Sequence, residues 1–376
     1  MIVNFDNAAT TYPKPPEVRL AVERAVAQCG SAGRGGHPIA ARSAELLYAA
    51  RERAGAFFGA EPEHVVFTAS CTHALNLAIQ GLAQGGGHFV ISNLEHNSVL
   101  RPVYALAKQG RIRYSIAAVG EDDAQTLQSF RSQLRQDTKA VICTLASNVT
   151  GQLLPWREIA ALCQERGICM VADGAQVCGI LPVHLSDGIN ILCTAGHKGL
   201  YGITGTGMLL TDGKFPLPPL MQGGSGSLSN HPEQPDFLPD ALECGTLNVA
   251  GAASIAAGLG FVQKKSMMNL YRRETALCDL LIHRLSAMPE VTVYRSPRAA
   301  YVPIVSFSIR GLPSEEVAAR LAGEGFCLRA GLHCAPLAHH TLGTADGTVR
   351  FAPSAFSKPQ DVLRLAAEIE KICKKL

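Results

Sequence analysis

The sequence contains no long hydrophobic run. Across its 376 residues, no apolar stretch reaches the ~18 residues expected of a membrane-spanning helix. The N-terminus also lacks the basic segment and apolar core of a secretory signal peptide. We therefore expect a protein that is not exported and has no membrane partner, and we predict a cytoplasmic location.

Charge of either sign is also sparse. Asp, Glu, Lys and Arg make up only 17% of the chain, and the net charge of +3 is too small and too evenly spread to predict nucleic-acid binding. Apolar residues make up 47%, which is enough to bury a sizeable core. The length allows one large domain and a smaller one. Neither an internal repeat nor a low-complexity tract is evident.

A C-x-x-C motif is absent, although the chain has twelve cysteines. Without such spacing a zinc site is poorly supported, and we predict no metal. Cysteines scattered through a long chain without a signal peptide favour free thiols in a reducing compartment. Cys143, Cys169 and Cys193 lie in apolar runs and are predicted to pack in the core.

Helical patterns alternate with short apolar runs through the first two thirds of the chain. Such alternation predicts an α/β fold with a mostly parallel central sheet. The predicted helices are 16–28, 43–58, 73–82 and 156–166; the predicted strands are 65–68, 88–92, 140–145, 168–172, 189–193 and 207–210; and 30–37 and 223–240 are predicted loops.

The last third of the sequence has a different pattern. A long helical stretch at 249–288 precedes a strand at 302–309 and a helix at 314–322, and Ser357 is predicted to cap a closing helix that has Pro359 in its first turn. We therefore predict three regions: an N-terminal segment near the active site (1–14), a large domain (15–250), and a long connecting helix with a small α+β domain (251–376).

Lys198 follows the predicted strand 189–193 in a glycine-flanked turn, and Asp173 ends the strand before it. Burial lowers a lysine's pKa, and a neutral amine forms Schiff bases with aldehydes. A lysine and an aspartate on neighbouring strands match the needs of pyridoxal phosphate (PLP), because the aspartate pairs with the pyridinium nitrogen. Either residue alone is more simply read as a surface lysine or a helix cap.

Three further strand ends carry polar side chains. Cys71 and Thr72 lie between a strand and the predicted helix 73–82, where the free N–H groups of the helix N-terminus and the Thr72 hydroxyl suit a phosphate, although most helices start with such caps. His96 follows another strand, where an imidazole can stack on a ring or cap a helix. Asn148 and Gln176 offer amide donors to a phenolic oxygen, although an Asn is often only a turn residue.

These motifs together resemble the cysteine desulfurases of the class V aminotransferase family, which are fold type I PLP enzymes. The similarity extends over nearly the whole chain, and its most specific parts are Gly-His-Lys and Arg-x-Gly-x-His-Cys-Ala. The matching segments are 6–10 (DNAAT), 71–72 (CT), 95–96 (EH), 147–148 (SN), 173–176 (DGAQ), 196–198 (GHK), 245–246 (GT) and 329–335 (RAGLHCA).

The resemblance implies a role for each matching residue. It makes Lys198 the Schiff-base lysine and Asp173 the partner of the pyridinium. The other implied cofactor contacts are ring stacking by His96, bonds to the ring oxygen from Asn148 and Gln176, and phosphate binding by Thr72 and His197; Cys71 is also predicted to bind the cofactor. Thr246 would reach the phosphate of a partner subunit's cofactor, which implies a homodimer with shared sites.

Cys334 distinguishes the desulfurases from the aminotransferases in this family. Its polar loop holds His333 and Arg329, and nearby cations favour the thiolate, although it is also one more cysteine among twelve. The resemblance assigns substrate contacts to Ala8, Asn148, Arg329 and Arg350, and a guanidinium suits a carboxylate bidentately. Cys334 and Arg350 are sixteen positions apart, and this short spacing resembles the group II enzymes, which have a short, ordered cysteine loop.

Three features depart from the family pattern. Ala195 replaces a serine three residues before the lysine, so a phosphate hydroxyl is lost or is supplied by Thr194 or another group. His73 stands where relatives carry glutamate after the phosphate threonine. The segment 223–244 is shorter than its counterpart in group II enzymes.

The predicted function is conversion of L-cysteine to L-alanine, with a persulfide formed on Cys334 and His96 as the proton shuttle. The acceptor is left open among iron–sulfur assembly, thiolated cofactors or tRNA, and selenium metabolism. One alternative is a selenocysteine lyase acting on L-selenocysteine, or another class V lyase or aminotransferase. A more distant alternative is a non-catalytic binding protein with the same fold.

Overall fold

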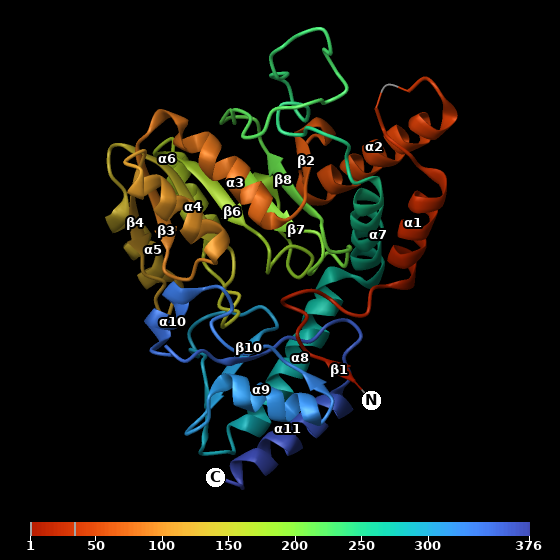
Figure 1. Ribbon diagram of the computed structural model, residues 1–376. Helices are drawn as coiled ribbons and strands as arrows, with labels where there is room; N and C mark the ends of the chain where they lie inside the picture. Colours follow the sequence, from red (N-terminus) through yellow and green to blue (C-terminus); the bar gives the residue numbers. More distant parts are fainter. Residues whose placement is uncertain (1, 34) are drawn as a thin grey trace.

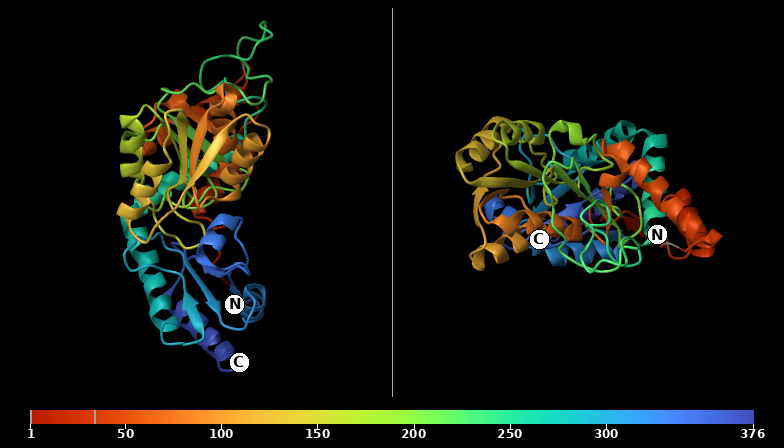
Figure 2. Two further views of the ribbon diagram at one scale, coloured as in Figure 1. Left: turned by 90° about the vertical axis from the view of Figure 1, so that its left-hand side faces the viewer. Right: turned by 90° about the horizontal axis from the view of Figure 1, so that it is seen from above.

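The computed structural model describes residues 2–33 and 35–376. A larger part is built on a seven-stranded sheet, and a smaller part contains the C-terminus (Figures 1 and 2). The N-terminal strand β1 (Val3–Asn4) lies in the smaller part, because it pairs in parallel with β11 (Phe326–Cys327). Within the described residues, no helix is long and apolar enough to cross a membrane.

The large sheet has the strand order β2-β8-β7-β6-β5-β3-β4. Six of the strands run in the same direction, and β8 alone is antiparallel to its neighbours, which confirms the predicted mostly parallel sheet. The strands are β2 (Val65–Thr68), β3 (His88–Ser92), β4 (Arg113–Ala117), β5 (Thr138–Thr144), β6 (Cys169–Asp173), β7 (Ile191–Ala195) and β8 (Gly207–Thr211).

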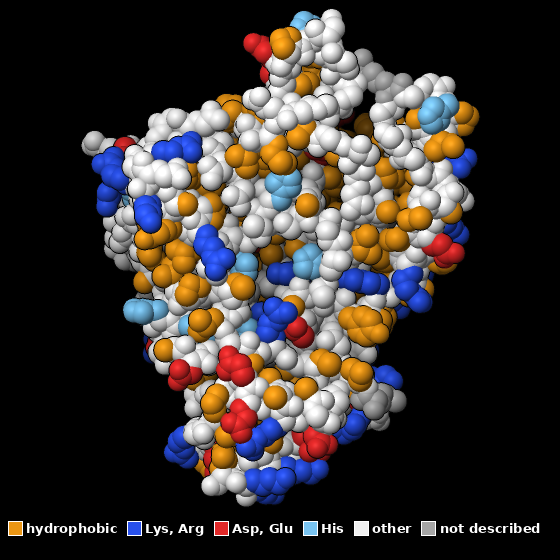
Figure 3. Space-filling model, in the orientation of Figure 1, with side chains coloured by type: hydrophobic (Ala, Val, Ile, Leu, Met, Phe, Trp, Pro, Cys, Tyr) orange, Lys and Arg blue, Asp and Glu red, His pale blue; other side chains and the backbone are white. Residues whose placement is uncertain are grey.

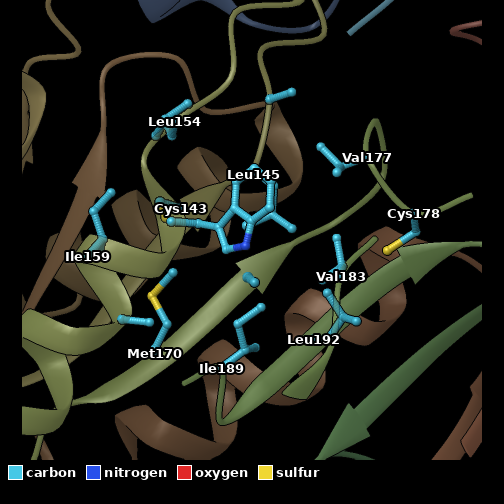
Figure 4. Close-up of a cluster of buried hydrophobic side chains, with 14 of the residues drawn as sticks. Cys143, Leu145, Leu154, Ile159, Met170, Val177, Cys178, Val183, Ile189 and Leu192 are labelled. Carbon is cyan, nitrogen blue, oxygen red and sulfur yellow. The ribbon is translucent and has the colours of Figure 1, made fainter. Parts of the chain in front are cut away.

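Helices cover both faces of this sheet, so its central strands are mostly apolar. On one face lie α3 (Cys71–Leu82) and α4 (Asn97–Lys108); on the other lie α5 (Asp123–Gln133), α6 (Trp156–Glu165) and parts of α2 (Pro38–Phe58) and α7 (Val249–Lys265). Cys143, Met170 and Leu192 belong to the hydrophobic core between the sheet and the helices of the second face (Figure 4). The remaining helix of this part, α1 (Pro16–Gln28), packs on α7.

The smaller part is an α+β unit around a three-stranded sheet of order β12-β10-β9. Phe5, from the N-terminal segment, lies against Phe351 and Phe326, so both ends of the chain contribute to this core. Its other elements are α8 (Met267–Leu285), β9 (Val291–Val293), β10 (Val305–Ile309), α9 (Ser314–Gly323), α10 (Pro336–Leu342), β12 (Val349–Phe351) and α11 (Pro359–Cys373).

The predicted helix 249–288 is wrong as a single element. Ser266 has φ 63°, in the left-handed region, and separates α7 from α8. A residue with that backbone cannot continue a right-handed helix. Periodicity alone cannot detect the break, because both flanking segments have helical patterns.

The predicted cap at Ser357 is also wrong. Lys358 holds the N-cap position of α11 and makes no side-chain cap, whereas the Ser357 hydroxyl accepts from the Ser354 N–H at 3.0 Å. Helix α2 begins five residues before the predicted Ser43, since Pro38 occupies its first turn and the His37 ring caps it.

Two loops were predicted from glycine content. Segment 223–240 contains neither helix nor strand and projects from the large part (Figures 1 and 2). The described residues of 30–37 are likewise irregular, and Arg34 lies outside the described residues. The strand predicted at 302–309 starts only at Val305, because the Val302 N–H donates to Gly151 O at 2.8 Å.

A buried carboxyl joins the two parts of the molecule. Glu274 on α8 accepts a hydrogen bond from the Tyr201 hydroxyl at 3.4 Å, and that hydroxyl accepts from the Ala355 N–H at 3.0 Å. Glu274 is 2% exposed, and burial raises its pKa to about 8. The carboxyl is therefore protonated at neutral pH.

This carboxyl makes stability depend on pH. Because its pKa is higher in the folded protein than in the unfolded chain, its stabilising contribution is full below the ordinary value and is lost as the pH rises towards about 8. The free energy of unfolding of the wild type should fall between about pH 6 and about pH 9. In Glu274→Gln, whose side chain stays neutral, this fall should be about 2 kcal/mol smaller.

Urea unfolding of both proteins at the two pH values measures this difference. Glu52→Gln is the matched control, since Glu52 is exposed on α2. Equal losses in the wild type and Glu274→Gln would contradict the prediction. Burial also raises the pKa of Glu95 to about 8. Glu95 therefore makes part of the unfolding free energy depend on pH in both proteins.

Candidate active site

The carboxyl ends of the parallel strands meet at one edge of the sheet, where they face the smaller part. Twelve of the thirteen predicted site residues line one pocket of about 360 Å³ at this edge, and Thr246 does not. Lys, Arg and His side chains gather around the hollow in the middle of the face in Figure 3. The twelve are Ala8, Cys71, Thr72, His96, Asn148, Asp173, Gln176, His197, Lys198, Arg329, Cys334 and Arg350.

Lys198 and Asp173 come from neighbouring strands, as predicted, since β6 pairs with β7. Burial lowers the pKa of Lys198, the negative charge of Asp173 opposes this shift, and Arg350 and Arg329 add to it. Asp173 is buried, and its Oδ1 accepts from the Ala175 N–H at 2.9 Å. The arrangement provides a lysine amine with a lowered proton affinity next to a fixed carboxylate.

A chain of hydrogen bonds runs from His96 to Thr72 through Ser98. The Ser98 hydroxyl lies 2.8 Å from His96 Nδ1 and 2.6 Å from the Thr72 hydroxyl. The Ser98 N–H also donates to His96 Nδ1 at 3.0 Å. Because Nδ1 accepts this bond, the neutral ring carries its proton on Nε2. Burial lowers the pKa of His96, which favours the neutral ring.

His96 therefore has two functions, since its ring also caps α4. Ser98 was missed from the sequence, although it follows His96 by two residues. A serine in the first turn of a helix is so common that only its contacts reveal its place in the site.

The start of α3 offers backbone donors. Ser70 is the N-cap, and its hydroxyl accepts from the His73 N–H at 3.1 Å. The N–H groups of Cys71 and Thr72 have no partner among the described residues. The Thr72 side chain is exposed towards the pocket. This geometry fits an anion at the helix N-terminus.

The structure decides which hydroxyl can stand in for the one lost at Ala195. Thr194 is fully buried and does not line the pocket, so it cannot replace that hydroxyl. Thr204, in the loop between β7 and β8, does line the pocket and is exposed. His197 lines it too; its Nδ1 is buried and has no partner in the part of the chain that the structure describes, and burial lowers the pKa of His197 to about 4.

Arg350 on β12 is 2% exposed and is held from two sides. Its Nη1 donates to Asn148 O at 2.8 Å, and its Nη2 lies 3.1 Å from Asp6 Oδ1. The other oxygen of Asp6 lies 3.2 Å from Arg329 Nε. Asp6 thus bridges the two arginines, and the cluster retains one net positive charge.

Asp6 lies in the matching segment 6–10 but is not among the predicted site residues. Its contacts span more than 320 positions of chain, and no local pattern reveals such a pairing. It reaches the arginines because β1 and the Asp6–Ala352 bridge attach the N-terminal segment to the smaller part.

The Cys334 loop is attached to the large part by its carbonyl groups. The Asn97 N–H donates to Cys334 O at 2.7 Å, and Asn148 Nδ2 donates to His333 O at 2.7 Å. His333 and Cys334 have φ values of 48° and 57°, so two successive residues are left-handed. This backbone presents an exposed thiol to the pocket.

The positive charge expected beside Cys334 does not come from His333. Burial, reinforced by the charge of Arg350, lowers the pKa of His333 to about 2, so its ring is neutral at physiological pH. Its Nε2 lies 3.1 Å from Thr348 O. Arg329 and Arg350, which line the same pocket, carry the positive charge instead.

The two amide side chains reach the pocket differently. Asn148 directs one N–H of Nδ2 at His333 O, and its Oδ1 is buried with no partner among residues 2–33 and 35–376. Gln176 Nε2 donates to Ala8 O at 3.1 Å, which ties the N-terminal segment to the site. Each amide nitrogen keeps a second N–H for a ligand. Thr246 is exposed in the loop before α7, outside the pocket.

The family follows from comparison with known proteins. The model of the class V aminotransferases matches residues 3–365, and the chain belongs to this family. A probable cysteine desulfurase from Methanothermobacter thermautotrophicus is 29% identical over 379 residues, covering 97% of this chain and 94% of that protein. A cysteine desulfurase from Synechococcus elongatus is 29% identical over 389 residues, covering 99% of this chain and 60% of that one.

Solved structures agree with this assignment. The apo structure of a cysteine desulfurase from Thermococcus onnurineus NA1 has a TM-score of 0.91 and 26% identity, covering 100% of this chain and 95% of that chain. The cysteine desulfurase CsdA from Escherichia coli, in an S-sulfonic acid form, has a TM-score of 0.88 and 25% identity over the same shares. The predicted family and fold class are confirmed, and these similarities support the predicted enzyme class.

Proposed function

We propose that this chain is a PLP-dependent cysteine desulfurase that converts L-cysteine to L-alanine and holds the sulfur on Cys334. The observation that carries the proposal is the presence of Cys334 in the same pocket as Lys198, Asp173 and Arg350. An amine, a buried carboxylate, a buried guanidinium and an exposed thiol are the groups that this reaction needs.

The residues present fit the cofactor. The free N–H groups that begin α3 and the unpartnered Nδ1 of His197 suit its phosphate. Asp173 would pair with the ring nitrogen, His96 would stack on the ring, and Asn148 and Gln176 would donate to its oxygen. When bound as a Schiff base, PLP draws electrons from the substrate's α-carbon and so makes its proton removable.

Arg350 is proposed to bind the substrate carboxylate. Two of its N–H groups are engaged by Asn148 O and Asp6, and the guanidinium keeps further donors. Because Asp6 neutralises one of the two arginine charges, the remaining charge matches one carboxylate. Ala8 and Arg329 complete this side of the pocket.

Two groups are proposed to move protons. Lys198 can accept the substrate's α-proton as a neutral amine, because burial lowers its pKa. His96 carries its proton on Nε2, because Nδ1 is held by Ser98. It can release that proton inside the pocket while Nδ1 takes up another from the Ser98 hydroxyl at 2.8 Å, so the ring stays neutral. The Ser98 contact therefore determines which nitrogen of the ring is the donor.

Cys334 supplies the nucleophile. Its thiolate attacks the substrate's sulfur, the carbon–sulfur bond breaks, and the sulfur stays on Cys334 as a persulfide. The substrate carbon keeps the bonding electrons and takes up a proton, which gives alanine. Arg329 and Arg350 line the same pocket as this thiol.

Product analysis tests the proposal. Purified protein loaded with PLP should form alanine from L-cysteine and, with a thiol reductant present, an equal amount of sulfide. L-selenocysteine is the comparison substrate. Alanine from L-selenocysteine alone would favour the lyase alternative, and no alanine from either would contradict the proposal.

A homodimer with shared sites is proposed for Thr246. Its exposed position outside the pocket of its own chain supports a role at a partner's site. We predict that the protein elutes as a dimer and that mixing inactive Thr246→Arg and Lys198→Ala subunits restores part of the activity, because one site of the hybrid has both residues intact. Light scattering and activity assays check this; a monomer, or mixtures that stay inactive, would contradict it.

The acceptor and the compartment are also proposals. All twelve cysteines are free, which is consistent with the reducing cytoplasm. Transfer of sulfur towards iron–sulfur assembly is one proposed use. Comparison of sulfide release with and without a candidate acceptor protein would test it, and no increase would count against that acceptor.

A further inference from the structure

Cys71 is the second cysteine of the pocket, and its position is tightly fixed. It is the first residue of α3, directly after the N-cap Ser70, and is 8% exposed. The backbone of Ser70 and Cys71 lies on Gly207 of β8, where an added Cβ would come within 2.4 Å of the Ser70 carbonyl carbon. Only glycine at 207 lets the start of the helix approach the sheet this closely.

The Cys71 thiol points at the carboxylate of Asp173. Its Sγ lies 3.4 Å from Asp173 Oδ1, within the range of a sulfur hydrogen bond. Burial, together with the charge of Asp173, raises the pKa of Cys71 well above its ordinary value. The thiol therefore keeps its proton and is the donor in this contact. Cys334 differs from Cys71 in that its side chain is exposed.

The two donors on Asp173 act on the same oxygen. Oδ1 accepts from the Cys71 thiol and from the Ala175 N–H, whereas Oδ2 has no partner among the described residues. Rotation of the carboxylate would break both bonds. The free oxygen is consequently the one left for a ligand in the pocket that Asp173 lines.

We propose that Cys71 is a positioning residue for Asp173: its S–H bond holds Oδ1 so that Oδ2 faces the ring nitrogen of the cofactor. The inference rests on the proposed binding of PLP. It separates the two cysteines of the pocket, since Cys334 acts as a thiolate on the substrate and Cys71 acts as a thiol on the carboxylate.

The first test measures PLP affinity. Each protein is dialysed against known PLP concentrations, and bound cofactor is measured by visible absorbance. Cys71→Ala should weaken binding about fivefold, as expected for one lost hydrogen bond. Cys71→Ser keeps a donor and should stay within about twofold of the wild type. Cys169→Ala, at a buried thiol of β6 without a bond to Asp173, is the matched control and should also stay within about twofold.

The second test asks whether the effect runs through the carboxylate. In an Asp173→Ala background, Cys71→Ala should change PLP affinity by less than about twofold, because the acceptor is gone. Infrared difference spectra of the loaded proteins, wild type minus Cys71→Ser, should show an S–H stretching band at lower frequency than those of the other buried thiols. The band should move up in Asp173→Ala.

The outcomes separate the two proposals. Equal PLP affinity in the wild type and Cys71→Ala, or an unshifted S–H band, would overturn the role of Cys71 and leave the proposed function intact. A fivefold effect that persists in the Asp173→Ala background would assign Cys71 a packing role and overturn the inference. A wild type that binds no PLP would overturn both.

Discussion

Cys334→Ser is expected to lower alanine formation from L-cysteine by roughly 1,000-fold or more, because a hydroxyl cannot form the persulfide. The visible absorbance of bound PLP should be unchanged, since no proposed cofactor contact is lost. The measurement is the rate of alanine release from L-cysteine at saturating PLP. Activity on L-selenocysteine should fall less, because selenium leaves carbon more readily than sulfur.

Cys29→Ser is the matched control for this substitution. Cys29 is a half-buried free cysteine directly after α1, and it does not line the pocket. Its variant should keep the wild-type rate. Full activity of Cys334→Ser on L-cysteine would contradict the proposed nucleophile, whereas loss of both activity and bound PLP would point to a disturbed pocket.

Lys198→Ala should lose the Schiff-base absorbance and lower activity by roughly 1,000-fold or more, since the same amine is proposed to hold the cofactor and move the α-proton. Lys198→Arg should behave in the same way, because a guanidinium stays protonated and cannot form a Schiff base. Visible spectra of the dialysed proteins and alanine assays measure the two effects.

A second lysine provides a demanding control. Burial lowers the pKa of Lys14 to about 8, and its Nζ donates to His197 O at 3.0 Å, so its chemistry makes it a rival for the Schiff base. Lys14 does not line the pocket. Lys14→Ala should therefore keep the Schiff-base absorbance. If Lys14→Ala lost this absorbance and Lys198→Ala kept it, Lys14 would be the Schiff-base lysine instead.

The gathering of site residues at one edge of the sheet was predictable from sequence, because parallel strands bring their carboxyl ends to the same edge. The alternation of apolar runs and helices predicted the sheet, and the short segments after three of these runs contain His96, Asp173 and Lys198. His96 follows β3, Asp173 ends β6 and Lys198 follows β7. These strands lie in the contiguous order β7-β6-β5-β3, so the three side chains come to the same edge.

Features that depend on contacts across the chain were not predictable. The bridge from Asp6 to the two arginines joins opposite ends of the sequence, and Ser98 is notable only through its bonds. The left-handed residue between α7 and α8 has no local signal in the sequence. The charge of His333 was misjudged because burial, which keeps its ring neutral, cannot be read from neighbouring residues.

The most direct test of the account is the mass of the Cys334 peptide after PLP-loaded protein reacts with L-cysteine without reductant. The account predicts a gain of one sulfur atom on Cys334, removed by a thiol reductant, with one alanine formed for each persulfide. Alanine formed while Cys334 stays unmodified at every time point, or sulfur found on Cys71 instead, would contradict it.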